Sequence, residues 1–162
     1  MKTATLPPAE LYEEDFYAWT QDQARELRRL RELRPNVPLD LEHLAEEVAG
    51  LGKEQRNALR SWTVQIMTHL LFLTHSPARE PRHGWENEIG RARTEVELRM
   101  TPTLRRDLQR NRLKLYALAA RRTRERLNRY GESATALPET CPYSLDKILA
   151  DWWPDADNGD AR

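Results

Sequence analysis

The stretch "LTHSPAREPRHGWENEI", residues 73–89, separates two amphipathic segments and decides where the chain changes direction. Pro77 and Pro81 lack a backbone N–H donor, so a helix that enters this stretch must end there, and Gly84 permits a turn. Two of the four histidines and a tryptophan lie in the same stretch. We therefore predict a corner between two helices, and we treat a reaction site there as the less favoured alternative.

Helical periodicity extends outward from this corner in both directions, and no stretch alternates convincingly like a strand. We predict an all-α fold, a single helical bundle of four to five main helices. Two glycines cost about 2 kcal/mol relative to alanine within a helix, so we expect a kink or short break near Gly50–Gly52. The expected helices span about residues 14–33, 40–74 with that interruption, 85–99 and 103–130, with a short helix capped by Ser144.

Large apolar side chains at three- and four-residue steps are expected to form the core. On the first helix the expected stripe is Tyr12, Phe16, Trp19, Gln23, Leu27 and Leu30, and on the second it is Leu41, Leu44, Val48 and Leu51. The fourth helix is apolar on two sides, which places it centrally in a bundle or against a partner.

The domain boundaries follow from the same pattern. We predict a flexible N-terminus at residues 1–11, the helical bundle at 12–154 and a disordered tail at 155–162. The aromatic C-terminal segment ends in Trp152 and Trp153 and is expected to dock on the bundle, since exposed tryptophans forfeit several kcal/mol of burial.

Composition excludes several classes of protein. The 162 residues carry a formal net charge of zero, and Cys141 is the only cysteine, so no intrachain disulfide can form. The N-terminus lacks the apolar core of a signal peptide, and no apolar run is long enough to cross a bilayer, so we expect a cytoplasmic protein without membrane contact. No nucleophile, phosphate-loop, dinucleotide or metal-ligand spacing occurs. We assign no catalytic residue, metal or cofactor, and the sequence does not favour an enzyme.

His69 is the polar residue that raises the sharpest question, because it lies on an apolar helical stripe. Such a histidine is expected to be a neutral core group; the alternative is a general base or a ligand-binding group. The alternative site would be a polar cluster that gathers His69, Glu46, Glu47, Arg93, Trp19 and Asp15. Within that cluster, Glu47 and Arg93 could form a salt bridge in the core.

The fourth helix carries most of the local charge asymmetry, with ten Lys or Arg residues against Asp107 and Glu125. A candidate anion-binding or nucleic-acid-binding face consists of Arg105, Arg106, Arg110, Arg121 and Arg124. No helix-turn-helix spacing is evident and the whole chain is neutral, so nucleic acid is not the favoured partner.

Several motifs occur in an order that resembles a known family. They are "YEEDFYAWTQDQARELR" (12–28), "LDLEHLAEEVAGLG" (39–52), "MTHLLFL" (67–73), Trp85 with Ile89 and Arg93, "TPTL" (101–104), "CPYSLDKIL" (141–149) and "DWWP" (151–154). Together they resemble the bacterial family catalogued as domain of unknown function 29, collinearly over residues 12–154. The resemblance implies an all-helical protein and brings no assigned activity.

Three functions remain as hypotheses. The first is a protein-binding or adaptor module, for example an antitoxin-like protein, whose partner is another protein or a second copy. The second is an enzyme or a small-ligand or metal binder with a polar pocket around His69. The third is nucleic-acid binding through the arginine-rich helix. An open polar pocket at His69 would favour the second hypothesis, and a histidine sealed by leucines would favour the first.

Overall fold

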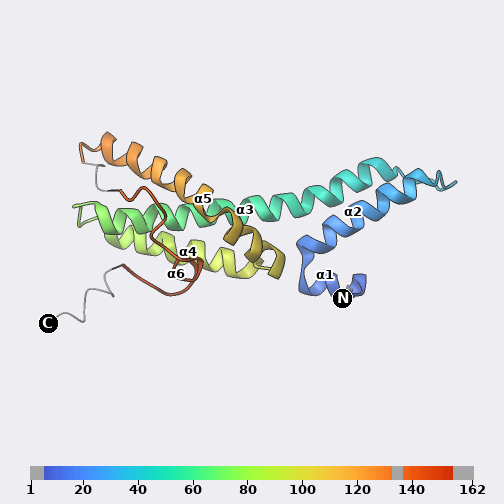
Figure 1. Cartoon of the computed structure of the whole chain (residues 1–162), viewed down its shortest axis with the longest axis horizontal. Coiled ribbons are helices and arrows are strands. Elements are labelled where there is room, and N and C mark those ends of the chain that lie inside the picture. Colours follow the sequence, from blue (N-terminus) through green and yellow to red (C-terminus); the bar gives the residue numbers. More distant parts are fainter. Residues whose placement is uncertain (1–5, 133–136, 155–162) are drawn as a thin grey trace. The chain divides into compact units, whose positions relative to one another are not determined.

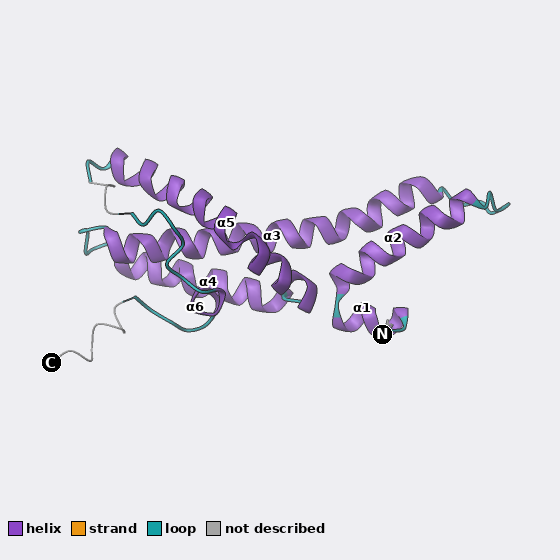
Figure 2. Cartoon of the chain, in the orientation of Figure 1, coloured by secondary structure: helices purple, strands orange, loops and turns teal. Residues whose placement is uncertain are grey.

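A computed structural model describes residues 6–132 and 137–154 and confirms the predicted all-α class (Figures 1 and 2). The described residues contain no strand. Their helices are α1 (Pro8–Glu14), α2 (Phe16–Glu32), α3 (Leu41–His75), α4 (Arg82–Arg99), α5 (Pro102–Arg129) and α6 (Leu145–Leu149). The predicted disordered tail and the first five residues of the predicted flexible N-terminus lie outside the described residues.

The chain divides into two compact units, whereas residues 12–154 were predicted as one bundle. Unit 1 contains the chain up to Ala58 together with Thr101–Arg106, and unit 2 contains Leu59–Met100 and the chain from Asp107 onward. Both α3 and α5 contribute residues to each unit. The two units therefore share helices and are not joined by a loop.

Unit 1 is built on an antiparallel hairpin in which α2 lies beside the first half of α3 (Figure 1). The seam between the two helices is made of small residues, the buried Thr20 and Ala24 on one side and Ala45, Ala49 and Gly52 on the other. The Gln21 amide donates a 3.3 Å hydrogen bond across the seam to the Ala49 carbonyl. Small side chains let the two backbones approach closely.

Of the kink or short break predicted near Gly50–Gly52, the break does not occur, since α3 is helical from Leu41 to His75 without interruption. A Cβ atom on Gly52 would lie 2.1 Å from Oγ1 of Thr20, so glycine is required for α2 to pack at this point. Glycine inside a helix is normally destabilising, and at this position it is the residue that lets α2 pack closely against α3.

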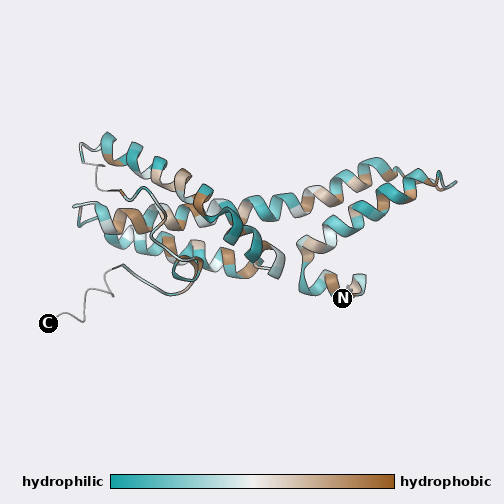
Figure 3. Ribbon diagram, in the orientation of Figure 1, coloured by the Kyte–Doolittle hydropathy of each residue, from teal (hydrophilic) through white to brown (hydrophobic). Residues whose placement is uncertain are grey.

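Of the large apolar residues predicted as the core of the hairpin, Leu41 is buried and several others are exposed. Leu44 and Leu51 of α3 are 40% and 49% exposed, and Leu30 of α2 is 41% exposed. Figure 3 shows apolar residues interspersed with polar ones along these helices. The interior of the hairpin is thus the small-residue seam, and several of the predicted core leucines face solvent.

The N-terminal helix begins inside the segment that was predicted to be flexible. α1 starts at Pro8, where the missing N–H of proline costs no hydrogen bond. Asp15, with φ −147° and ψ 77°, separates α1 from α2. The buried Asp15 carboxylate accepts hydrogen bonds from the backbone N–H groups of Ala18 (3.0 Å) and Thr103 (2.8 Å), so it serves the first turns of two helices.

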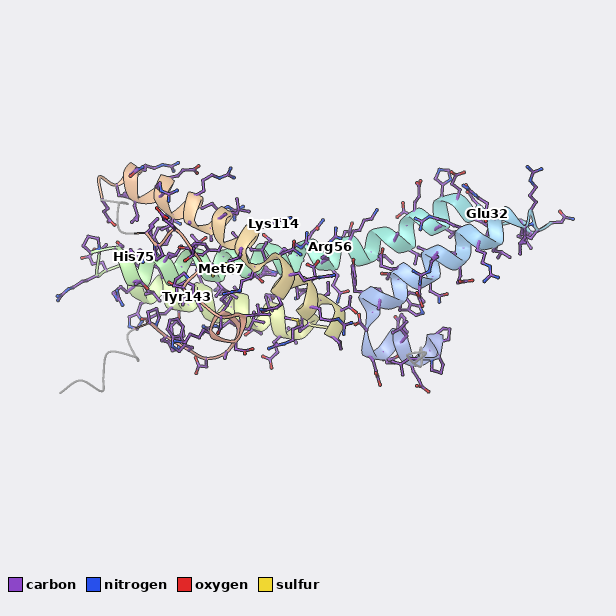
Figure 4. All side chains as sticks on the ribbon, viewed as in Figure 1. Glu32, Arg56, Met67, His75, Lys114 and Tyr143 are labelled. Atoms are coloured by element: carbon purple, nitrogen blue, oxygen red, sulfur yellow. The ribbon has the colours of Figure 1, made fainter. Side chains whose placement is uncertain are left out.

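Unit 2 contains the larger apolar core, which the second half of α3, α4 and most of α5 supply. Figure 4 shows Met67 of α3 among the side chains of this unit, and Met67 is fully buried. Other side chains exposed by less than 2% in this unit include Leu59, Ile66, Leu70, Leu71, Ile89, Leu108 and Ile148.

The predicted docking of the aromatic C-terminal segment is confirmed within unit 2. Arg93 of α4 donates hydrogen bonds to the carbonyl oxygens of Lys147 (3.2 Å), Ile148 (3.1 Å) and Trp152 (2.8 Å). The predicted cap also forms, since the Ser144 hydroxyl accepts a hydrogen bond from the Lys147 N–H. One guanidinium thus anchors α6 and the tryptophan that follows it.

Candidate functional site

Polar side chains interrupt the apolar face of α3 in unit 2 and open onto a hollow. This hollow, which we name the His69 pocket, has a volume of about 650 Å³, within the range of small-molecule sites. The predicted corner between α3 and α4 supplies one wall and α5 supplies another. The lining residues are Ser61, Gln65, Thr68, His69, Pro81, Gly84, Trp85, Glu88, Arg122 and Arg126.

His69 is 8% exposed, and its Nδ1 atom is buried without a hydrogen bond to any described residue. Burial lowers the pKa of His69 below its usual 6.5; the charge of Arg126 lowers it further, and that of Glu88 opposes the shift. The imidazole is therefore neutral near pH 7, with one ring nitrogen as donor and the other as acceptor.

The cationic groups of the pocket are Arg122 and Arg126, one turn apart on α5. Both are exposed, and neither forms an ion pair with a described residue. Like charges at this spacing repel by a few tenths of a kcal/mol, roughly 0.2–0.5. The guanidinium of Arg126 lies 5.4 Å from the ring centroid of Phe72, a cation–π contact that holds it at the pocket wall.

The one carboxylate in the lining, Glu88, accepts a 2.7 Å hydrogen bond from the Gln65 amide. The pocket therefore presents two guanidinium groups against a single carboxylate that already has a partner. Its charge balance favours an anionic ligand.

The N-terminus of α4 adds to this preference. Pro81 precedes the helix, and no side chain among the described residues caps it. Pro81, Gly84 and Trp85 of this helix start all line the pocket. Uncapped N–H groups and the helix dipole favour a negative charge at such a position. The arrangement can hold a carboxylate or phosphate group, which planar guanidinium groups bind in a bidentate manner.

The comparison with family models gives a match over residues 11–153, to the model described as "Domain of unknown function DUF29". The chain belongs to the DUF29 family. A comparison with curated proteins gives no match. This DUF29 chain is similar to a solved structure, an alpha-helical protein of unknown function (rru_a3208) from Rhodospirillum rubrum ATCC 11170. The TM-score is 0.77 at 25% identity, covering 86% of this chain and 89% of that one.

The members of the predicted polar cluster are divided between the two compact units of this DUF29 structure, with His69 and Arg93 in unit 2. Glu46 and Glu47 are exposed on α3 and belong to unit 1. Within unit 2, Arg93 binds carbonyl groups of the C-terminal segment.

The remaining members of the cluster have structural positions in unit 1. Asp15 serves the first turns of α2 and α5, as described above. Trp19 packs against Tyr12 and Phe16, with ring centroids 4.9 Å and 5.8 Å away. Of the predicted cluster, only His69 lines the pocket.

The predicted basic face is exposed along α5 of the DUF29 fold, and all of its members lie outside the pocket lining. Arg106 donates a hydrogen bond to the Thr103 hydroxyl, and Arg121 lies 3.9 Å from Glu125. The other three, Arg105, Arg110 and Arg124, are solvent-exposed.

Sequence reasoning placed Trp85 at the corner and missed four other residues that line the pocket: Gln65, Glu88, Arg122 and Arg126. A usable signal was present on α3, where polar residues at positions 61, 65, 68 and 69 follow helical spacing on an otherwise apolar face.

Two classes of site find no support in the part of the chain that the structure describes. No group of three or more His, Cys, Asp or Glu side chains there is placed to hold a metal ion. Nor does any of the described helices combine the length and apolar character needed to span a bilayer.

Proposed function

We propose that this protein binds a small anionic ligand in the His69 pocket. The observation that carries the proposal is the pair of guanidinium groups, Arg122 and Arg126, which face a hollow of about 650 Å³ without an ion-pair partner among the described residues. An anion between them would relieve their repulsion and gain charge-assisted hydrogen bonds.

The neutral imidazole and a serine hydroxyl give such a ligand orientation. Because Nδ1 is buried, His69 has one ring nitrogen for a ligand, and the exposed Ser61 adds a hydroxyl donor to the same wall, whereas the Thr68 hydroxyl already donates to the Val64 carbonyl. We place this activity in the bacterial cytoplasm, where the free cysteine Cys141 remains reduced. Binding, and not catalysis, is the function proposed.

The proposal is tested with inorganic phosphate on the full chain by ¹H–¹⁵N NMR. The backbone amide of Gly84 and the Nε–H signals of Arg122 and Arg126 are expected to shift saturably with phosphate and not with chloride at equal ionic strength. Arg122→Ala and Arg126→Ala each remove a charged hydrogen bond, so each should weaken binding about tenfold or more.

Arg124→Ala is the matched control, because Arg124 is exposed on the same turns of α5 and does not line the pocket. It should leave the phosphate titration unchanged. The proposal is wrong if phosphate does not shift these NMR signals, or if all three variants lose the same affinity for phosphate.

A second candidate function is favoured by the exposed leucines of the hairpin in unit 1. Leu44 and Leu51 lie two turns apart on α3. Glu47 lies three residues after Leu44, and Glu54 lies three residues after Leu51. Neither glutamate pairs with a cation among the described residues. This face fits an amphipathic helix with an apolar stripe bordered by Lys or Arg, as an adaptor module would bind.

Site-specific photo-crosslinking in the native host tests the second candidate. A photoreactive residue at position 51 should give a defined adduct with a basic amphipathic helix, and Glu47→Lys with Glu54→Lys should abolish that adduct. Position 98 is the control, since Leu98 is 74% exposed on α4 of unit 2. Identical adducts at both positions, or none at position 51, would exclude the candidate.

A further inference from the structure

A second hollow adjoins the His69 pocket in unit 2. It has a volume of about 460 Å³ and is lined by Phe72, Ser76, Ala78, Pro81, Trp85, Arg126, Leu127, Tyr130 and Glu132. We name it the Tyr130 hollow. Pro81, Trp85 and Arg126 line both cavities, so the two share a wall.

The Tyr130 hollow has the opposite chemistry to its neighbour. Two of its polar side chains bind each other, since the Ser76 hydroxyl donates a 2.7 Å hydrogen bond to the Glu132 carboxylate, and Arg126 lies on the wall shared with the His69 pocket. The remaining surface is aromatic and apolar. The half-buried Trp85 stacks on the buried Phe72, with ring centroids 5.2 Å apart at 27°, which forms a fixed aromatic wall.

Tyr130 stands at this hollow with 69% of its surface exposed. Its position is fixed by the end of α5, because Gly131 adopts φ +70° and the N–H groups of Gly131 and Glu132 donate to the carbonyls of Asn128 and Leu127. This is the hydrogen-bond pattern of a helix closed by a left-handed glycine. The backbone at Tyr130 is thus held in place, and its exposed ring has few torsion angles to order when it stacks on a ligand.

From this juxtaposition we propose that the ligand is an aromatic organic anion that spans both cavities. Its acidic group lies between Arg122 and Arg126 in the His69 pocket, and its ring lies against Tyr130 and Trp85, which is backed by the buried Phe72. Arg126 sits at the shared wall, with its charge available to the anion and its stem and guanidinium against Phe72. The inference rests on the proposed anion-binding function and adds the chemical class of the ligand.

The test uses three probes on the full chain. Anilinonaphthalene sulfonate has both an anionic group and fused rings, N-phenylnaphthylamine has the rings without the charge, and inorganic phosphate has the charge without rings. The sulfonate is expected to bind more tightly than either of the other probes, and phosphate is expected to compete with it.

Two variants separate the two halves of the site. Tyr130→Ala should weaken binding of the sulfonate roughly three- to tenfold, the factor that an aromatic contact supplies, and should leave phosphate binding unchanged. Arg122→Ala should weaken the sulfonate and phosphate and leave the neutral amine unchanged. Leu98→Ala, which changes an equally exposed apolar residue away from both cavities, should alter none of them.

The two possible failures differ in their readout. If phosphate binding depends on Arg122 and Tyr130→Ala leaves the sulfonate affinity unchanged, the aromatic half of the inference is wrong and anion binding stands. If neither the sulfonate nor phosphate responds to Arg122→Ala, anion binding itself is wrong and the inference falls with it.

Discussion

Gly50 and Gly52 look alike in the sequence and differ in the packed helix. A Cβ atom on Gly50 would meet nothing within 4 Å, whereas a Cβ on Gly52 would lie 2.1 Å from Oγ1 and 3.3 Å from Cβ of Thr20. The hydroxyl of Thr20 is fixed by a 2.7 Å hydrogen bond to the Tyr17 carbonyl, so it cannot yield without cost. The two positions therefore form a matched pair for mutation.

Gly52→Ala is expected to destabilise the fold by about 1–3 kcal/mol, the usual cost of overpacking, even though alanine favours the helix. Gly50→Ala should stabilise it by up to about 1 kcal/mol, because the helix gains propensity and nothing is displaced. Urea unfolding followed by circular dichroism measures both changes. Equal effects at the two positions would show that the α2–α3 seam is looser than described.

His69 gives the fold a pH dependence whose sign follows from burial. Its pKa is lowered in the folded state, so the unfolded chain binds a proton at higher pH than the folded chain does. Its contribution to stability is complete above the unfolded pKa of about 6.5 and is lost as pH falls toward the folded value. His75 is shifted in the same direction by burial, while exposed His43 beside Asp40 is shifted upward and acts oppositely.

His69→Gln should therefore flatten the decline in the free energy of unfolding between about pH 7.5 and pH 5. The difference from the wild type cannot exceed about 1.4 kcal/mol per pH unit, the effect of one proton. Urea titrations at several pH values measure the slope. His83→Gln is the control, because the His83 side chain is 95% exposed, and a matching change of slope there would contradict the assignment to burial.

At the scale of single residues, sequence pattern located His69 and the corner and missed the rest of the pocket. Arg93 and Glu47 were paired because both could face inward, but Arg93 meets backbone carbonyls, which leave no trace in side-chain pattern. Arg122 and Arg126 are two among ten basic residues of one helix. Only the placement of Trp85 and the start of α4 distinguishes them from their neighbours.

The hairpin exemplifies what periodicity can and cannot predict for an element. The lengths and positions of α2 and α3 follow from helical spacing and from Asp40, which caps α3 through the His43 N–H. The inward face was assigned to the largest apolar residues, yet apart from Leu41 the buried positions are the small Thr20, Ala24, Ala45 and Ala49. A hydrophobicity pattern weights size, so it overlooks a seam in which close backbone approach replaces bulky side chains.

Arg93 is expected to hold the C-terminal segment, residues 145–152, against α4. Arg93→Met keeps much of the side-chain volume and removes the donors to three carbonyls, so it should destabilise the fold by about 2 kcal/mol or more. Hydrogen exchange of residues 145–152 should rise before that of α4. Arg93→Lys should restore only part of the protection, since an ammonium lacks the planar fork that reaches several acceptors.

Arg91→Met provides the comparison for this variant, because the Arg91 side chain is 79% exposed on the same helix. It should leave both stability and exchange near wild-type values. Equal protection of residues 145–152 in both methionine variants would mean that α6 is held by its own apolar contacts and not by the guanidinium.

For the molecule as a whole, two compact units that share α3 and α5 are expected to unfold together. Helical order propagates along an unbroken helix at little cost per residue, so melting one half of α3 exposes the end of the other. Trp19 reports on unit 1, and Trp85 on unit 2. Urea transitions of single-tryptophan variants that retain one or the other should coincide with the loss of helical circular dichroism. Separate midpoints would show that the units are energetically independent.

Fold class and the corner could be predicted at this scale, and the division into two units could not. Periodicity says which residues form a helix, but it says nothing of which stretch of a long helix belongs to which core. Along α3, the buried residues change from mostly small ones before Ala58 to mostly large ones from Leu59 onward, which is a local sign of the division.

The boundary between the units falls inside α3, so an insertion or a deletion at this point is expected to disrupt packing. A single inserted codon between positions 58 and 59 would turn every later residue of that helix by roughly 100° and carry it about 1.5 Å onward. Homologues of this chain are therefore expected to vary in length in the loops after residues 33 and 76. The middle of α3 is expected to keep the same number of residues.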